Sequence, residues 1–354
     1  MTLKAAIIAD DLTGALDTGT PFVEAGLSVV VAIDMEAARE AVAIGCDVVV
    51  VNTASRALDE REAAERVHSA AEVFRGEKPA VVMKKIDSRL KGNVAVESMA
   101  LAKAFGLKTV VVAPAIPDQE RLTYRGCVVG RGINRPLPIA ELFKTGADRI
   151  VVADAEDDVD LDRIAEGHDW QTTLAVGARG LGAALARHLG ERGPSTKREF
   201  AASPRTLFAF GSRDPITAAQ MNRLESTGAL RMVVDAPMGE IEYGEGLALP
   251  VLLRCTGDMA ADARLVARNF AAGVKAVIDD TRPDMLTVGG GDTALAVFRI
   301  LGVRVLTPKG EIEAGIPWFD VTAADGRRFR CAVKSGGFGK PDSLLKLVLR
   351  NQAA

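Results

Sequence analysis

The chain has 354 residues, enough for two domains of ordinary size, and 48% of them are hydrophobic. A formal net charge of -3 and an aromatic content of only 5% argue against a nucleic-acid or anionic-membrane partner. Four scattered cysteines and three histidines disfavour a zinc site, a redox pair and a Ser-His-Asp triad. We therefore expect a cytoplasmic protein without membrane-spanning segments, whose acid–base chemistry comes from carboxylates or lysines.

Short runs of Val, Ile and Ala alternate with helical stretches through the first half. Strands are expected at 5–9, 29–33, 48–51, 80–83, 109–113, 149–153 and 172–176, and helices at 35–43, 60–74 and 95–105. Strands that read as continuous apolar runs are buried on both faces. The pattern predicts an α/β fold with a mainly parallel sheet wrapped by helices.

Polar clusters follow four of these strands, at residues 10–15, 52–56, 84–93 and 114–117. The carboxyl ends of parallel strands lie on one edge of the sheet, which is where open α/β sheets bind ligands. The cluster at 84–93 places Lys84, Lys85, Arg89 and Lys91 around Asp87 and Ser88, which favours a small anionic ligand. Arg56 adds a candidate bidentate clamp for a carboxylate.

Asp10 and Asp11 stand side by side at the end of the first strand. One of them can accept a proton from a substrate hydroxyl or help to hold a metal-bound water. The alternative is a structural role, in which a carboxylate caps the helix that follows. The residues alone leave both readings open.

The second half begins after a polar, breaker-rich stretch at 190–199. Strands are expected at 206–210, 230–234, 250–253 and 329–333, with helices from Asp214 through Leu224 and over 262–272. Two glycine loops stand out, at 289–293 and 334–340. In the first, Asp292 and Thr293 are N-cap types that would begin a helix, and such a turn is a candidate phosphate cradle. The alternative is a tight strand-to-helix turn that binds no ligand. Two such loops in one half of the chain favour a single nucleotide site. Neither a Walker A motif nor a G-x-G-x-x-G after the first strand is present.

These motifs together resemble the four-carbon acid sugar kinase family. The resemblance rests on six blocks in order: residues 9–15 (Ala-Asp-Asp-Leu-Thr-Gly-Ala), 85–93 (Lys-Ile-Asp-Ser-Arg-Leu-Lys-Gly-Asn), 113–117 (Ala-Pro-Ala-Ile-Pro), 211–217 (Gly-Ser-Arg-Asp-Pro-Ile-Thr), 290–293 (Gly-Gly-Asp-Thr) and 334–339 (Lys-Ser-Gly-Gly-Phe-Gly). It implies an N-terminal domain that binds threonate, erythronate or 3-oxo-tetronate, and a C-terminal domain that binds ATP. Phosphoryl transfer to a terminal hydroxyl, with Mg²⁺ on the phosphates, would occur in the cleft between them.

The expected domains are residues 1–190 for the acid sugar, a linker at 191–204, and residues 205–354 for ATP. The expected catalytic residues are Asp10, Asp11, Lys85 and Asp87, and the expected substrate-binding residues are Thr13, Arg56, Lys84, Ser88, Arg89 and Gly92. The expected nucleotide-binding residues are Ser212, Gly290, Gly291, Asp292, Thr293, Ser335, Gly336 and Gly337. No dedicated metal site is expected, and the sequence leaves homo-oligomerisation open.

The chain departs from the family in two places. Family members carry Gly-Arg-x-Thr where this chain has Glu120-Arg121-Leu122-Thr123, and the segment between Gly126 and the linker is shorter than usual. Both departures put the identity of the acid sugar in question. Two other hypotheses stay open: a non-catalytic sensor of acid and nucleotide on a kinase fold, and a nucleotide-dependent hydroxy-acid oxidoreductase.

Overall fold

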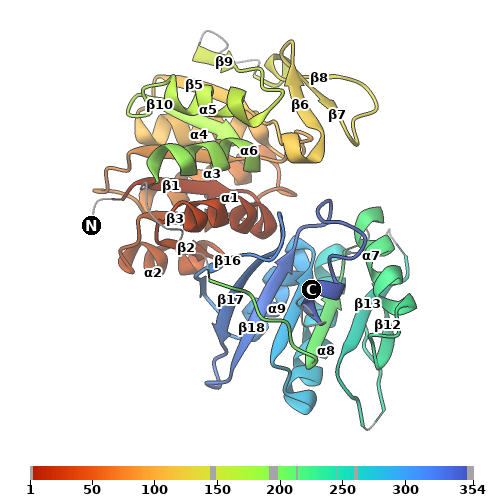
Figure 1. Cartoon of the computed structure of the whole chain (residues 1–354). Helices are drawn as coiled ribbons and strands as arrows, with labels where there is room; N and C mark the ends of the chain where they lie inside the picture. The colour runs from red at the N-terminus through yellow and green to blue at the C-terminus, as the bar shows by residue number, and fades with distance from the viewer. Residues whose placement is uncertain are drawn as a thin grey trace. The chain divides into compact units, whose positions relative to one another are not determined.

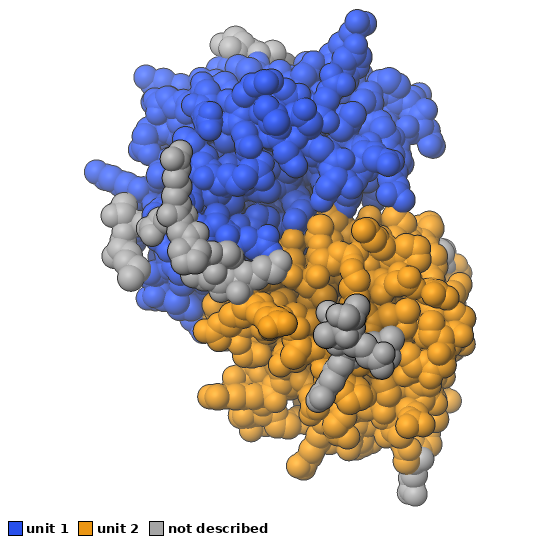
Figure 2. Space-filling view, in the orientation of Figure 1, with its two compact units in different colours: residues 1–197 blue, residues 198–354 orange. Residues whose placement is uncertain are grey.

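The computed structural model describes residues 3–143, 149–190, 198–212, 214–244, 246–258 and 262–348. The chain divides into unit 1, residues 1–197, and unit 2, residues 198–354 (Figure 2). Each unit has a mainly parallel sheet wrapped by helices, which confirms the predicted fold class (Figure 1). The predicted linker 191–204 runs across the division, and its residues 191–197 lie outside the described residues. None of the described helices is long and apolar enough to cross a membrane.

The main sheet of unit 1 consists of parallel strands in the order β2-β3-β1-β4-β10-β5-β9. The strands are β1 Ala5–Ala9, β2 Val29–Ala32, β3 Val48–Asn52, β4 Val81–Lys85, β5 Thr109–Ala113, β9 Ile150–Val152 and β10 Thr173–Gly177. The central strands are buried along their whole length, as their Val and Ile runs predict. The predicted strand 80–83 extends further, so Lys84 and Lys85 are its last residues rather than a loop after it.

Helices cover both faces of this sheet. The helices α1 and α6 pack together with α5, while α3 packs on α4 (Figure 1). Their bounds are α1 Leu12–Glu24, α2 Ala38–Ala43, α3 Glu60–Glu72, α4 Val94–Phe105, α5 Asp158–Glu166 and α6 Arg179–Leu189, with short 3-10 turns η1 Met35–Ala37, η2 Pro117–Gln119 and η3 Ala140–Leu142. Asp11, Asp59 and Asp157 begin α1, α3 and α5 by accepting a hydrogen bond from a backbone N–H of the first turn.

A small antiparallel sheet follows β5 in unit 1. It contains β6 Arg121–Tyr124, β7 Cys127–Gly130 and β8 Leu137–Pro138. Glu120 precedes β6 with a φ of 54°, in the left-handed region that glycine adopts without strain. The glycine that the resemblance leads us to expect at this position would therefore fit the backbone, and the Glu120 side chain is exposed.

The sheet of unit 2 has the order β12-β13-β11-β14-β18-β17-β16, in which β16 and β17 are antiparallel to their neighbours. Its strands are β11 Thr206–Phe210, β12 Met232–Pro237, β13 Val251–Thr256, β14 Met285–Gly289, β16 Gly310–Glu311, β17 Pro317–Thr322 and β18 Arg328–Lys334. The two-residue β15, Val305–Leu306, is not part of this sheet. The strands β11, β14 and β18, which carry the predicted phosphate loops, are neighbours.

The helices of unit 2 lie on opposite faces of its sheet. On one face, Phe208 and Phe210 pack with Met221 and Leu224 of α7 Pro215–Ser226 and with the C-terminal turn η5 Leu345–Leu347. On the other, α8 Ala263–Thr281 packs on α9 Gly291–Ile300. The predicted helix 262–272 was too short, because Gly273 does not end it. A Cβ there would lie 2.7 Å from the Cβ of Ile241, so this glycine serves close packing.

Candidate functional site

The carboxyl edge of unit 1 is centred on an ion pair between Asp10 and Arg56. The Nε of Arg56 donates to Oδ2 of Asp10 at 2.8 Å, and its Nη2 donates to Oδ1 at 2.7 Å. The backbone N–H groups of Ser55 and Arg56 also donate to the carbonyl of Asp10, at 3.1 and 3.3 Å. Because β1 and β3 are neighbours, their two carboxyl ends meet here. The predicted carboxylate clamp thus holds a carboxylate of the chain itself.

Asp10 is buried, and nearby cationic side chains stabilise its negative charge. Burial by itself raises the pKa of this carboxyl, but the attraction of Arg56, Lys84 and Lys85 outweighs it, and the pKa is lowered. Asp10 is therefore ionised at neutral pH. Gly92 lies directly against the pair, because a Cβ on it would come within 3.2 Å of Cγ of Arg56 and 3.3 Å of Oδ2 of Asp10.

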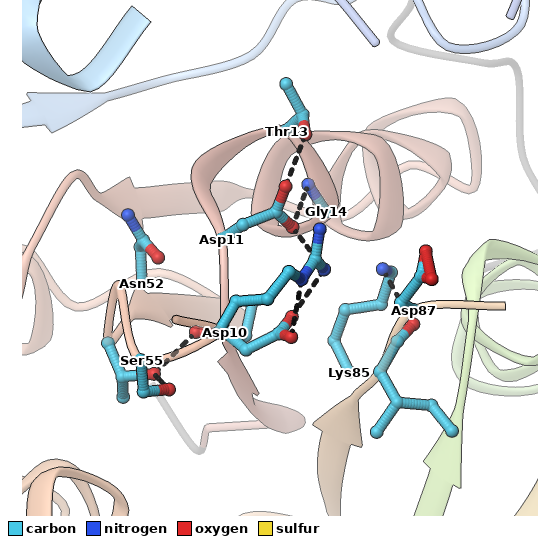
Figure 3. A network of polar contacts seen from close by, with 12 residues as sticks. Asp10, Asp11, Thr13, Gly14, Asn52, Ser55, Lys85 and Asp87 are labelled. Atoms are coloured by element: carbon cyan, nitrogen blue, oxygen red, sulfur yellow. Dashed lines mark hydrogen bonds and ion pairs between the residues drawn. The ribbon is translucent and has the colours of Figure 1, made fainter. Parts of the chain in front are cut away.

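Asp11 takes the capping role that the sequence offered, and its side chain also stays partly open to solvent. Its Oδ1 accepts the N–H of Gly14 at 3.0 Å and Nη2 of Arg56 at 2.9 Å, and its Oδ2 accepts the hydroxyl of Thr13 at 2.6 Å (Figure 3). It is the N-cap of α1, yet its side chain keeps 19% of its surface exposed, against 4% for Asp10. Asp11 is therefore the carboxylate of the pair that a ligand can reach.

Gly14 leaves the space in which Asp11 and Lys85 approach each other. A Cβ at this position would lie 2.5 Å from Oδ1 of Asp11 and 2.7 Å from Nζ of Lys85. The Nζ of Lys85 donates to the carbonyl of Ile86 at 2.9 Å, and Asp87 follows on the same loop (Figure 3). A carboxylate, an ammonium and a glycine N–H thus gather at the start of α1.

Lys84 has a different role from the one predicted. Its side chain is 0% exposed, and its Nζ lies 2.8 Å from Oε2 of Glu97, itself 2% exposed, on α4. Alternation along β4 turns Lys84 to the face that α4 covers, whereas Lys85 faces α1. A side chain with no exposed surface cannot touch a ligand, so the prediction that Lys84 binds substrate is wrong, and Lys84 is a structural lysine.

Ser88 is held by an arginine that the sequence pointed to only by its position. The Nη1 of Arg121 donates to Oγ of Ser88 at 2.5 Å and to Oε1 of Gln119 at 3.2 Å. Burial lowers the pKa of Arg121, and the nearby charge of Arg89 lowers it further, while Asp87 opposes them. Two arginines with one carboxylate make this part of the edge suited to an anion. The side chain of the neighbouring Glu120 is exposed, and Arg121 contacts Ser88.

The first glycine loop of unit 2 lies between two neighbouring strand ends. Gly290, with a φ of 101° that favours glycine, is the N-cap of α9, so Asp292 and Thr293 lie in the first turn rather than at the predicted cap. The N–H groups of Gly211 and Ser212 both donate to the carbonyl of Gly289 at 3.2 Å. The ends of β11 and β14 are thereby joined.

A cavity of about 330 Å³ opens beside this loop within unit 2. Five of the predicted nucleotide-binding residues line it: Ser212, Gly290, Gly291, Asp292 and Thr293. Gly211, next to Ser212 in the predicted 211–217 block, also lines it. The remaining wall was not predicted and comes from the end of β13, the loop after it and the first half of α8, namely Cys255, Asp258, Ala263, Val266, Ala267 and Phe270. An amphipathic helix pattern gives no sign that part of its apolar face lines a cavity, so sequence reasoning could not find this wall.

The second glycine loop adjoins the first without lining the cavity. The N–H of Gly290 donates to the carbonyl of Lys334 at 3.3 Å, and a Cβ on Gly336 would lie 3.2 Å from Oγ of Ser212. Ser335 and Gly337 continue this loop. Across the described ranges, no cluster of three or more His, Cys, Asp or Glu residues could hold a metal ion.

Comparisons with known proteins match the division of the chain. Residues 5–141 match the model of a sugar-binding N-terminal domain, and residues 252–344 match that of a nucleotide-binding C-terminal domain. The chain is thus a two-domain protein that joins a sugar-binding to a nucleotide-binding domain.

Similar proteins make the assignment more specific. A D-threonate kinase of Bordetella bronchiseptica is 30% identical, over 96% of this chain and 95% of its own length. A 3-oxo-tetronate kinase of Methylobacterium radiotolerans is 27% identical, over 97% and 98%. A crystal structure from Salmonella typhimurium LT2 has the same fold, with a TM-score of 0.74 at 20% identity and 98% of both chains covered. The chain belongs to the four-carbon acid sugar kinase family.

Proposed function

We propose that this chain is an ATP-dependent kinase that phosphorylates a terminal hydroxyl of a four-carbon acid sugar of the threonate, erythronate or 3-oxo-tetronate type. The observation that carries the proposal is the pair of unlike sites on the two sheets. Unit 1 presents a cationic edge on which the Asp11 carboxylate is accessible, and unit 2 presents a glycine-lined cavity. Phosphoryl transfer depends on positioning and charge neutralisation, which these two sites supply.

In unit 1 we assign proton acceptance to Asp11. Arg56 binds both oxygens of Asp10, so Asp10 keeps the guanidinium in place and is a positioning residue. Asp11 keeps exposed surface beside Lys85 and is placed to take the proton of the attacking hydroxyl. Arg89 and Arg121, with Ser88 between them, are the groups suited to the carboxylate of the acid sugar.

In unit 2 the cavity accepts the nucleotide. The apolar wall of α8 suits an adenine ring, and the N–H groups at the start of α9 suit phosphates. Mg²⁺ supplies charge neutralisation on the phosphates when bound. It typically keeps several waters and takes one or two carboxylates besides the phosphates, so a dedicated cage is not required. Asp258 and Asp292 are the carboxylates that line the cavity and would hold the ion or its waters.

The test is ADP release from ATP and Mg²⁺ with D-threonate, L-threonate, D-erythronate and 3-oxo-tetronate, each offered separately. Turnover that requires one acid and disappears in Asp11→Asn supports the proposal. Binding of acid and nucleotide without product would instead identify a sensor. Reduction of NAD(P) by a hydroxy acid would identify an oxidoreductase. Either result would overturn the kinase assignment.

A further inference from the structure

Lys334 is a buried lysine at the end of β18, directly under the second glycine loop. Its side chain is 0% exposed. Its Nζ donates to Oγ1 of Thr217 at 2.9 Å and to the carbonyls of Ser335 and Gly336 at 3.0 and 3.1 Å. All three acceptors are neutral. Within the described residues, no carboxylate lies within 4 Å of this ammonium; Asp214 and Glu313 are the acidic groups that act on it from further away.

A buried ammonium without a paired carboxylate costs free energy. Burial accordingly lowers the pKa of Lys334 to about 8, although Asp214 and Glu313 oppose the change. A methionine would fill the same space without this cost. The charge therefore needs a compensating role in the molecule.

The lysine fixes the direction of two peptide groups in the loop. A trans peptide points its C=O and N–H in opposite directions. Since the carbonyls of Ser335 and Gly336 point toward Nζ, the N–H groups of Gly336 and Gly337 point away from it. In the part of the chain that the structure describes, neither of these N–H groups donates a hydrogen bond. Successive N–H groups of this kind form an anion-binding nest.

Side chains of α7 also donate hydrogen bonds to carbonyls of this loop. The hydroxyl of Thr217 donates to the carbonyl of Gly336 at 2.9 Å. The Nε2 of Gln220 donates to the carbonyls of Phe338 and Lys340 at 3.2 and 2.8 Å. The carbonyl of Lys334 itself accepts the N–H of Gly290, so one residue connects both glycine loops.

We propose that Lys334 is a positioning residue for the nucleotide phosphates. Through its hydrogen bonds to two peptide carbonyls it orients the N–H groups of Gly336 and Gly337, and its positive charge attracts the phosphates without direct contact with the ligand. The inference rests on the proposed function of unit 2. A bound anion favours the charged form of the lysine, so phosphate affinity should be highest while the ammonium is protonated and should fall as pH rises through about 8.

The experiment is calorimetric titration of ADP and of adenosine into the full chain, its Lys334→Met variant and a control, Lys275→Met. Lys275 pairs with Asp279 on the exposed side of α8. At pH 7.5 we expect Lys334→Met to bind ADP at least tenfold more weakly, to bind adenosine within twofold of the parent chain, and to melt no earlier without ligand. Lys275→Met should match the parent in both ligands.

The pH profile separates positioning from a merely structural role. Between pH 7.5 and 9.5 the ADP affinity of the parent chain should fall about tenfold, and that of Lys334→Met should stay flat. A Cys255→Ala background removes the thiol that lines the cavity and should keep the fall. The profile of the parent chain decides the question even if Lys334→Met does not fold.

Three results would be decisive against the inference or against the proposed function. If Lys334→Met binds ADP as well as the parent, or loses ADP and adenosine equally, the inference fails while the kinase assignment stands. If the ADP effect appears but no acid sugar is phosphorylated, the inference stands and the proposed function fails. If the parent chain binds no ADP, both fail.

Discussion

The first four strands of the two units have the same order in their sheets, but the carboxyl edges of the sheets differ in the charged side chains that they carry. The first four strands of unit 1 lie in the order β2-β3-β1-β4, and those of unit 2 lie in the corresponding order β12-β13-β11-β14. In unit 1 the carboxyl edge is crowded with charged side chains that bind one another, as Asp10 and Arg56 do. In unit 2 the same edge is made of two glycine turns, the first of which lines a cavity.

This difference teaches how one topology can serve two ligands. Side-chain charges fixed by mutual ion pairs distinguish the carboxylate and hydroxyl groups of a small molecule. Backbone N–H groups at glycine turns suit phosphates, because only glycine lets the chain approach them closely. The fold supplies the edge, and the residues after each strand decide the chemistry.

The largest effect is expected from Asp11→Asn, which removes the accessible carboxylate of the Asp10–Asp11 pair in unit 1. Asparagine keeps the cap of α1 but cannot accept the substrate proton, so we expect turnover to fall by about a hundred- to ten-thousand-fold. ADP affinity, which belongs to unit 2, should not change. Steady-state kinetics and calorimetry measure the two quantities. Asp59→Asn, at the N-cap of α3, is the matched control. Full turnover in Asp11→Asn would move the catalytic role elsewhere.

The second test concerns the buried pair of Lys84 and Glu97 in unit 1. Glu97→Gln leaves a buried ammonium without its carboxylate, and we expect a loss of about 3–5 kcal/mol in the free energy of unfolding. Urea unfolding measures it. Glu65→Gln breaks an exposed pair with Arg61 and should cost at most about 0.5 kcal/mol. Equal, small losses in both variants would show that burial does not set the strength of the pair.

A third test uses the titration of Asp17, which is buried in α1. Burial raises its pKa to about 6, against the attraction of Lys85 and Arg179. The unfolded chain ionises this group first as pH rises, so its destabilising effect is absent below about pH 4, grows toward pH 6 and is complete above it. Asp17→Asn should therefore stabilise the chain at pH 7.5, relative to its effect at pH 3.5, by roughly 3 kcal/mol. Urea unfolding at both pH values checks this, and a pH-independent effect would contradict it.

The smallest effect is expected from a substitution in the first glycine loop of unit 2. Gly290→Ala forces a side chain onto a φ of 101° and should cost about 1–3 kcal/mol, shared between stability and ADP binding. Gly228→Ala is the control, because its φ of 69° is also positive but nothing lies within 4 Å of the added Cβ. Calorimetry should show weaker ADP binding only for Gly290→Ala. Unchanged binding there would separate the turn from the nucleotide.

Local pattern predicted most of the secondary structure and the polar sheet edge. Short, mainly apolar runs led to β1, β3, β5 and β11 nearly to the residue, because a strand buried on both faces is mostly apolar. Clusters after those strands correctly placed Asp10, Asp11 and Arg56 together. The glycine loops of unit 2 also came out as neighbours, since β14 and β18 pair in parallel.

The rest depended on contacts between segments distant in sequence. Whether Lys84 or Lys85 faces the ligand edge depends on which helix covers each side of β4, and only the packed sheet decides that. Ser88 meets Arg121 across 33 positions, and α8 brings an apolar wall to the cavity. Sequence by itself determined the elements, the family and the residue types at the edges, since these follow from local periodicity and motif. Tertiary structure alone decided which charges pair with one another and which stay open to a ligand, because pairing depends on distance and burial.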